Sequence, residues 1–264
     1  MNEIQARIQE ELRRIEREEQ VRILFACESG SRAWGFPSRD SDYDVRFLYI
    51  RTEDSYLSIF EKRDVIERPI SDNLDINGWD LKKALNLFRK SNPPLLEWLQ
   101  SPIRYEENWN VAESIRRLSP FAFSPKSCMY HYLNMAKGNY RDYLRGEQVR
   151  IKKYFYVLRP VLACVWIEQF GTMPPIQFEE LLKAIVPESS ELMQVVCRLL
   201  ERKKAGEELD MEPAIRPVQN YLEAELERLE QVALQFAGSG NSQDRELDIL
   251  FRSALREVWE TTKT

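Results

Sequence analysis

The sequence predicts an α+β protein, in which a small domain of strands and helices at residues 1–110 is followed by an α-helical domain at residues 111–264. Two observations predict this fold class. Short apolar runs with β-branched and aromatic residues occur in the first part of the chain. Beyond about residue 110, apolar residues recur at helical spacing instead. Strands that precede a run of helices are typical of an α+β architecture.

The first domain is expected to begin with an amphipathic helix at residues 2–20, where apolar residues recur every three or four positions. Residues 28–39 contain two glycines and a proline, which predict a loop around a short helical turn. Asp80 has the position and chemistry of a helix N-cap, so a helix is expected from there through residue 90. The expected strands are 22–27, 43–51, 64–69 and 73–79.

The second domain is expected to contain helices and no strands. Its apolar residues follow helical periodicity, and polar segments connect the helices. The predicted helices are 125–144, 150–170, 177–204, 212–236 and 243–261.

Composition and charge restrict the class of function. Charged residues make up 31% of the chain and no apolar run is long enough to span a bilayer, so we expect a soluble protein without a membrane partner. The four cysteines are far apart, and the N-terminus carries no signal peptide, which favours a reduced, cytoplasmic setting. A net charge of −5 gives no overall reason to expect nucleic acid, although an acidic chain can still carry a local basic groove.

A single histidine, His131, excludes metal sites built from several histidines and limits Ser-His-Asp chemistry to that one residue. The side chains left for catalysis are mainly carboxylates, lysines and arginines. These groups suit Mg²⁺-assisted phosphoryl chemistry.

The most informative stretch is Gly30-Ser31, followed after ten residues by Asp42-Tyr43-Asp44. A glycine lets backbone amides approach a phosphate closely, and a serine hydroxyl can donate to a phosphate oxygen. Asp42 and Asp44 lie at the start of an expected strand, where the two-residue period directs both to one face. Adjacent carboxylates repel one another unless a cation lies between them, so the pair predicts a hard-metal site.

A third carboxylate is expected from Asp75, which lies between Leu74 and Ile76 on a later strand. A neighbouring strand could bring it beside the pair. Asp80 is the competing candidate, but its N-cap position gives it a structural role, so we prefer Asp75. Three carboxylates would hold two Mg²⁺ ions, with Mn²⁺ as the alternative ion, and Asp75 could help to remove the proton of an acceptor hydroxyl.

Several flanking residues are candidates for phosphate binding. Arg32 is either a phosphate ligand or a surface arginine, and Ser41 either caps the strand or contacts a triphosphate. Residues 137–159 combine basic side chains with tyrosines, which indicates either a solvated helix face or phosphate binding. Lys152 and Lys153 would point about 100° apart on a helix, so only one is expected to face a ligand. The candidates in this segment are Lys137, Lys152, Lys153 and Arg159.

Gly-Ser alone is usually a turn, and Asp-x-Asp alone is usually a solvated strand end. In this order and spacing they resemble the signature of DNA-polymerase-beta nucleotidyltransferases. The stretches ESGSRAWGFPSRDSDYDVRFLY, LDINGWDLKKAL and NPPLLEWLQSPIRY are also similar to the RlaP, or YcgL-like, family of predicted nucleotidyltransferases linked to RNA repair. The resemblance covers about residues 20–175. It implies a mixed-sheet palm domain and Mg²⁺-dependent transfer of a nucleotide from an NTP.

The resemblance implies ATP or CTP as the donor and an RNA 3′ end, such as that of a tRNA, as the acceptor. It also implies that the helical domain supplies a lysine and an aromatic side chain to the nucleotide. Three other functions stay open: transfer to a small molecule, as in antibiotic-modifying relatives; transfer to a protein hydroxyl, as in toxin relatives; and nucleotide sensing without catalysis. The sequence does not indicate an oligomeric state.

Overall fold

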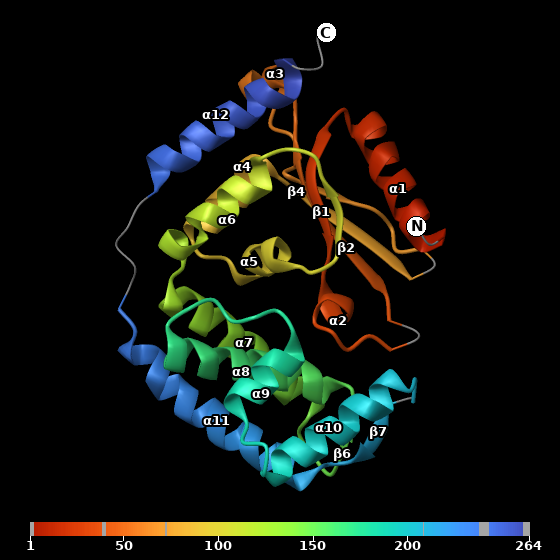
Figure 1. Ribbon diagram of the computed structural model, residues 1–264, viewed down its shortest axis with the longest axis vertical. Helices are drawn as coiled ribbons and strands as arrows, with labels where there is room; N and C mark the ends of the chain where they lie inside the picture. Colours follow the sequence, from red (N-terminus) through yellow and green to blue (C-terminus); the bar gives the residue numbers. More distant parts are fainter. Residues whose placement is uncertain (1–2, 39–40, 72, 208, 238–242, 261–264) are drawn as a thin grey trace. The chain divides into compact units, whose positions relative to one another are not determined.

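The computed structural model describes residues 3–38, 41–71, 73–207, 209–237 and 243–260 (Figure 1). Their contacts form two compact units. The sheet unit comprises the described residues of 1–30, 42–122 and 241–264, and the helical unit those of 31–41 and 123–240. The chain therefore passes from one unit to the other at Gly30-Ser31 and again at Ser41-Asp42, inside the Gly-Ser and Asp-x-Asp stretch.

A five-stranded mixed sheet with the order β3-β4-β2-β1-β5 forms the centre of the sheet unit. Strands β2 and β4 are parallel, whereas every other neighbouring pair is antiparallel. This sheet confirms the predicted α+β class. The strands are β1 (Arg22–Glu28), β2 (Tyr43–Ile50), β3 (Val65–Glu67), β4 (Leu74–Asp80) and β5 (Arg104–Glu107).

Helices cover both faces of this sheet (Figure 1). On one face, α1 (Glu3–Glu19) buries Ile8, Leu12 and Ile15 against a core that includes Val45 and Phe47 of β2. Burial of such apolar side chains is the main force that holds the layers together. The short helix α3 follows β2, and α12 returns to pack beside α4 and α6. The remaining helices are α3 (Glu53–Leu57), α4 (Leu81–Arg89), α5 (Pro93–Gln100), α6 (Val111–Ala122) and α12 (Asp244–Glu260).

The helical unit is built around α8, which is buried along most of its length and packs against α7 and α11. Residues 31–41 belong to this unit because Phe36 lies in an aromatic cluster, 5.1 Å from Phe155 and 5.4 Å from Phe178 between ring centroids. The elements are α7 (Pro125–Tyr143), β6 (Gln148–Arg150), α8 (Lys153–Phe170), α9 (Phe178–Ile185), α10 (Glu191–Lys204), β7 (Met211–Pro213) and α11 (Arg216–Gln235), with the short α2 (Gly30–Ala33) at the junction of the units.

Two expectations for the second half of the chain are wrong. The expected helix at 177–204 is two helices, because Pro187 lies between them and Ser190 caps α10 by accepting a hydrogen bond from the Met193 amide at 3.1 Å. The second half also contains strands, since β6 pairs with β7. Each has only three residues, which is too short for an alternating pattern to appear in the sequence.

Contacts place α6 and α12 in the sheet unit and residues 31–41 in the helical unit. The division of the chain into functional domains at 1–110 and 111–264 stays a prediction.

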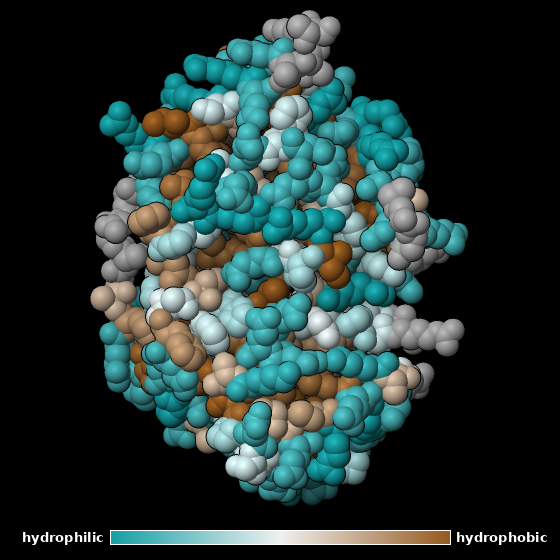
Figure 2. Space-filling model, in the orientation of Figure 1, coloured by the Kyte–Doolittle hydropathy of each residue, from teal (hydrophilic) through white to brown (hydrophobic). Residues whose placement is uncertain are grey.

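On the visible face, Figure 2 shows mainly hydrophilic side chains with separate hydrophobic patches, as expected for a chain rich in charged residues. Among the described residues, no helix combines the length and apolar character needed to cross a bilayer.

Gly78 in β4 tests the packing of the sheet, because a Cβ built at this position would overlap the ring of Phe47. We expect Gly78→Ala to lower the free energy of unfolding by about 1–3 kcal/mol through overpacking. Gly138 in α7 is the matched control, since a Cβ there meets nothing within 4 Å. Gly138→Ala should be neutral or stabilise by about 0.5–1 kcal/mol. Urea unfolding measures both; equal effects of the two substitutions would contradict the packing argument.

Candidate active site

Strand β1 ends at Glu28, and Gly30 follows with a positive φ of 59° that favours glycine. A Cβ at this position would overlap Oδ2 of Asp44. The backbone amide of Ser29 donates to the carbonyl of Asp44 at 2.8 Å, which fixes the turn against the start of β2. The glycine is therefore required twice, for its backbone conformation and for the space that the Asp44 carboxylate occupies.

The parallel register of β2 and β4 places Asp44 directly opposite Asp75. The amide of Tyr43 donates to the carbonyl of Asn73 at 2.7 Å and closes this end of the ladder. Asp42 precedes β2 by one residue, and its side chain is exposed. The structure thus brings Asp75 beside Asp44, which is the neighbourhood expected from the sequence.

Arg46 binds both of these carboxylates. Its Nη2 lies 3.1 Å from Asp44 Oδ1 and 2.7 Å from Asp75 Oδ2, and its Nη1 donates to the carbonyls of Val45 and Asp75, both at 3.0 Å. Charge-assisted hydrogen bonds of this kind offset the repulsion between adjacent carboxylates. Sequence analysis missed Arg46, although its two-residue spacing from Asp44 puts it on the same strand face.

Glu28 is a fully buried carboxylate behind the site. Its Oε1 accepts a hydrogen bond from the amide of Asp44 at 2.8 Å, and its Oε2 accepts one from the hydroxyl of Tyr105. A buried charge is tolerated when hydrogen bonds satisfy it. Glu28 therefore fixes the backbone of Asp44.

Asp80 occupies a different place. It lies opposite Tyr49 at the other end of β4, where its Oδ1 accepts from the Lys82 amide at 2.8 Å and its Oδ2 from the Tyr56 hydroxyl at 2.9 Å. Burial raises the pKa of this carboxyl above its usual range. Asp80 is thus the N-cap of α4, as the sequence indicated, and it is not beside Asp44.

Ser31, Arg32 and Ser41 lie together in the segment 31–41. The hydroxyl of Ser31 donates to that of Ser41 at 3.1 Å, and Arg32 Nη2 donates to the carbonyl of Ser41 at 2.7 Å. The amide of Ser38 also donates to the Ser41 hydroxyl at 2.9 Å. These bonds join Ser41 to the described residues 31–38, next to the chain positions of Gly30 and Asp42.

A cavity of about 330 Å³ in the helical unit is lined by Ser38, Lys152 and Lys203, among others. The side chain of Lys203 is buried, and its Nζ lies 5.7 Å from the centroid of the Phe36 ring. Burial, together with the neighbouring charge of Lys152, lowers the pKa of Lys203. Sequence analysis missed Lys203, which lies in a basic run at the end of α10 that resembles ordinary helix C-terminal charge.

The other predicted phosphate ligands lie elsewhere in the helical unit. Lys153 Nζ stacks on the rings of Tyr143 and Tyr156, at 4.2 and 4.9 Å from their centroids. Lys137 pairs with Glu230 on α11. Arg159 is buried and lies over the ring of Trp34 at 4.5 Å. Lys152 alone of the four candidates lines the cavity with Lys203.

Within the described part of the chain, no three His, Cys, Asp or Glu side chains are gathered as a metal cluster. One guanidinium nitrogen of Arg46 contacts an oxygen of Asp44 and an oxygen of Asp75. Carboxylate oxygens are also the donors that Mg²⁺ takes in proteins, so the chemistry of these two side chains fits a hard cation.

Comparison with known proteins identifies the family. Residues 4–253 match the RlaP family, which is described as the RNA repair pathway DNA polymerase beta family. A curated relative, named as the uncharacterized protein YcgL of Bacillus subtilis (strain 168), is 52% identical over 254 residues, which span 96% of this chain and 97% of the relative. The match over nearly the whole chain agrees with the mixed sheet and the Gly-Ser and Asp-x-Asp arrangement. The chain therefore belongs to the RlaP family of DNA-polymerase-beta-type nucleotidyltransferases associated with RNA repair.

Proposed function

We propose that this protein transfers a nucleotide from an NTP to the 3′ hydroxyl of an RNA, with Asp42, Asp44 and Asp75 as metal ligands. The observation that carries the proposal is the register that sets Asp44 opposite Asp75, next to the glycine turn at Gly30. The family description supports RNA repair as the setting. In the reaction the acceptor oxygen bonds to the α-phosphorus, the bond from that phosphorus to the β-phosphate oxygen breaks, and pyrophosphate leaves.

Asp42, Asp44 and Asp75 would hold Mg²⁺, with Mn²⁺ as the alternative. When bound, two such ions would lower the pKa of the acceptor hydroxyl and neutralise charge on the triphosphate. Asp75 is the carboxylate that we assign to the acceptor side, where its Oδ atoms can accept the hydroxyl proton. Glu28 and Gly30 hold the Asp44 backbone and carboxylate in place, so that this ligand needs little rearrangement.

Arg46 keeps the carboxylates together by charge compensation. Its guanidinium carries five N–H donors on three nitrogens. Two of these nitrogens, Nη1 and Nη2, already contact the backbone carbonyls and the aspartates. We assign it a positioning role at Asp44 and Asp75.

For the donor nucleotide, we assign the triphosphate to the hydroxyls of Ser31 and Ser41, the amides of their loop, and the cavity of Lys152 and Lys203. A buried lysine beside a second lysine favours a ligand of high negative charge. Arg32 is held to the Ser41 carbonyl and shapes this loop. The guanidinium of Arg159 packs on the ring of Trp34 and so supports the same loop.

The direct test of the function is incubation of the purified protein with Mg²⁺, each α-labelled NTP in turn, and total bacterial RNA, resolved on a denaturing gel. We expect label from ATP or CTP on a discrete RNA band, which Asp42→Asn and chelation of the metal both abolish. Pyrophosphate release that depends on Asp42 and on a protein or small-molecule fraction, without labelled RNA, would keep the chemistry and overturn the RNA acceptor.

Substitution of the two aspartates of β4 distinguishes a role in metal binding from a role in the fold. Asp75→Asn removes a metal ligand, so turnover should fall more than about 10³-fold, because metal stabilisation of the transition state is worth several kcal/mol. Asp80→Asn removes the same charge but keeps a good N-cap, so turnover should change less than about threefold. Single-turnover rates measure both. The reverse order would mean that Asp80 is the third ligand, and thermal unfolding verifies that both variants are folded.

The lysine cavity predicts a specific kinetic change. Lys152→Ala and Lys203→Met should each raise the KM for the NTP about tenfold, which corresponds to the loss of one charge-assisted hydrogen bond. Methionine at position 203 retains the buried aliphatic stem. The matched control is Lys183→Ala, an exposed lysine of the same unit on α9. An unchanged KM in both cavity variants would remove this cavity from the nucleotide site.

A further inference from the structure

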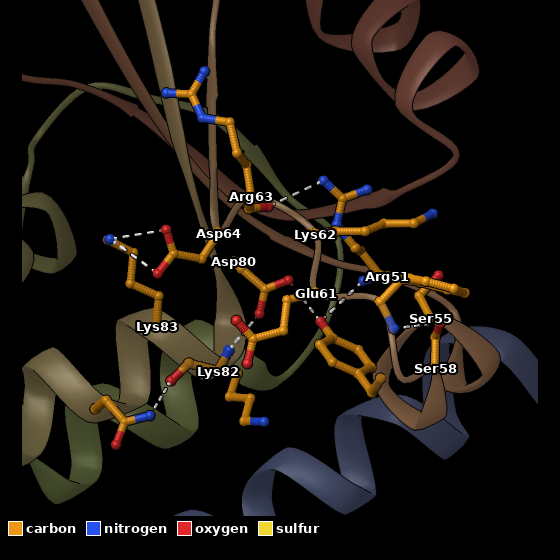
Figure 3. Close-up of a pocket in the computed structure, with 13 residues that line it drawn as sticks. Arg51, Ser55, Ser58, Glu61, Lys62, Arg63, Asp64, Asp80, Lys82 and Lys83 are labelled. Atoms are coloured by element: carbon orange, nitrogen blue, oxygen red, sulfur yellow. Dashed lines mark hydrogen bonds and ion pairs between the residues drawn. The ribbon is translucent and has the colours of Figure 1, made fainter.

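A second cavity, of about 560 Å³, lies in the sheet unit where β2 and β4 end (Figure 3). Its walls come from residues 51–64, which follow β2, and from residues 80–86, which end β4 and form the start of α4. Cationic side chains predominate: five of them line the cavity with three carboxylates. The residues used below are Arg51, Phe60, Glu61, Lys62 and Lys82.

Arg51 is the unusual member of this lining. It is 7% exposed, and its hydrogen bonds to the carbonyls of Glu19 and Arg63 are long, at 3.3 and 3.4 Å. Its buried Nε has no hydrogen-bond partner, and the carboxylate on which its charge acts, that of Asp80, already accepts hydrogen bonds from the Tyr56 hydroxyl and the Lys82 amide. Burying a cation whose hydrogen bonds are incomplete is costly. An arginine in this state on the wall of a cavity indicates an anionic ligand.

The carboxylates of the cavity are mostly committed to other groups. Asp64 pairs with Lys83 at 3.0 Å, and Asp80 accepts from Tyr56 and from the amide of Lys82. Glu61 is the remaining acid, and it is exposed. Lys62 and Lys82 are exposed and form no ion pair with a described residue, so their charges are available to a ligand.

The position of the cavity separates it from the candidate active site. Asp44 and Asp75 lie at the beginning of β2 and β4, whereas Arg51 follows β2 and Asp80 ends β4. Five to seven residues of strand, at about 3.3 Å each, make a separation of about 20 Å. The cavity is therefore a second site and not part of the carboxylate cluster.

We propose that this cavity binds a backbone phosphate of the acceptor RNA, several nucleotides before the reacting 3′ end. The inference rests on the proposed RNA acceptor. A stacked strand advances about 3.4 Å per nucleotide, so about six nucleotides cover the distance between the two sites. Phe60 lies on the cavity wall with 75% of its side chain exposed, which offers a ring for base stacking. The site would make the enzyme favour a strand over a free nucleotide as its acceptor.

The test is the affinity for a fluorescent 12-nucleotide single-stranded RNA, measured by anisotropy without Mg²⁺ or NTP. Each lost phosphate contact lowers the salt slope by about 0.7, so Lys62→Ala and Lys82→Ala should each weaken binding about fivefold at 0.1 M salt. Arg51→Met should weaken it at least as much. Lys90→Ala is the matched control, because it removes the same charge from the far end of α4 and should leave affinity unchanged.

Because this measurement needs no catalysis, its failure is distinct from failure of the proposed function. Unchanged RNA affinity in all three cavity variants, with transfer to RNA intact, would overturn this inference alone. A loss of AMP or inorganic phosphate binding in Lys82→Ala, with RNA binding unchanged, would also overturn it, since the phosphate would then belong to a free nucleotide. Thermal unfolding of Arg51→Met verifies the fold, and the two exposed lysines carry the test if that variant is unstable.

Discussion

The parallel pairing of β2 with β4 is the constraint on which both sites of the sheet unit depend. Side chains directly opposite in a register share a face, so this pairing alone sets Asp44 beside Asp75. The same ladder fixes Asp80 next to Tyr49 at its other end, where the cationic cavity opens. A shift of one residue would turn one strand's carboxylate to the opposite face. The buried pair Val45 and Ile76 prevents such a shift, because each must stay in the core beneath α1.

That register creates an electrostatic problem which the surrounding residues solve. Two carboxylates on neighbouring strands repel, and Arg46 compensates them with one nitrogen shared between both. Glu28 places a third carboxyl group close behind, and its two oxygens accept hydrogen bonds from the Asp44 amide and the Tyr105 hydroxyl. The site is thus held in shape by fixed hydrogen bonds before any ligand binds. Such preorganisation is what metal-assisted transfer requires of a protein.

The sequence predicted the parts of this arrangement that have a local pattern. The central strands have apolar runs, and the position of Asp80 predicts a helix N-cap. Because the N-cap role accounts for Asp80, Asp75 is the preferred third carboxylate. The spacing of Arg46 from Asp44 places the two on one strand face, but its second carboxylate partner, Asp75, is 29 residues away. Lys203 lies beside Phe36 and Lys152, which are also distant in sequence, so its place in the cavity has no local pattern. The return of α12 to the sheet unit escaped prediction for the same reason: Trp259 donates to the carbonyl of Arg51, more than 200 residues away.

The placement of residues 31–41 in the helical unit has a consequence for how a nucleotide would be held. The side chain of Phe36 packs in an aromatic cluster, and that of Trp34 packs against Arg159. The hydroxyl of Ser31 also donates a hydrogen bond to that of Ser41. The described residues that these contacts fix would lose little conformational entropy if their hydroxyls bound phosphate. The two ends of the segment 31–41 are peptide-bonded to Gly30 and Asp42 of the sheet unit. Ser31 and Ser41, whose hydroxyls are hydrogen-bonded to each other, are therefore the chain neighbours of Gly30 and of the Asp-x-Asp pair, so a phosphate bound at these two hydroxyls would lie one residue along the backbone from each.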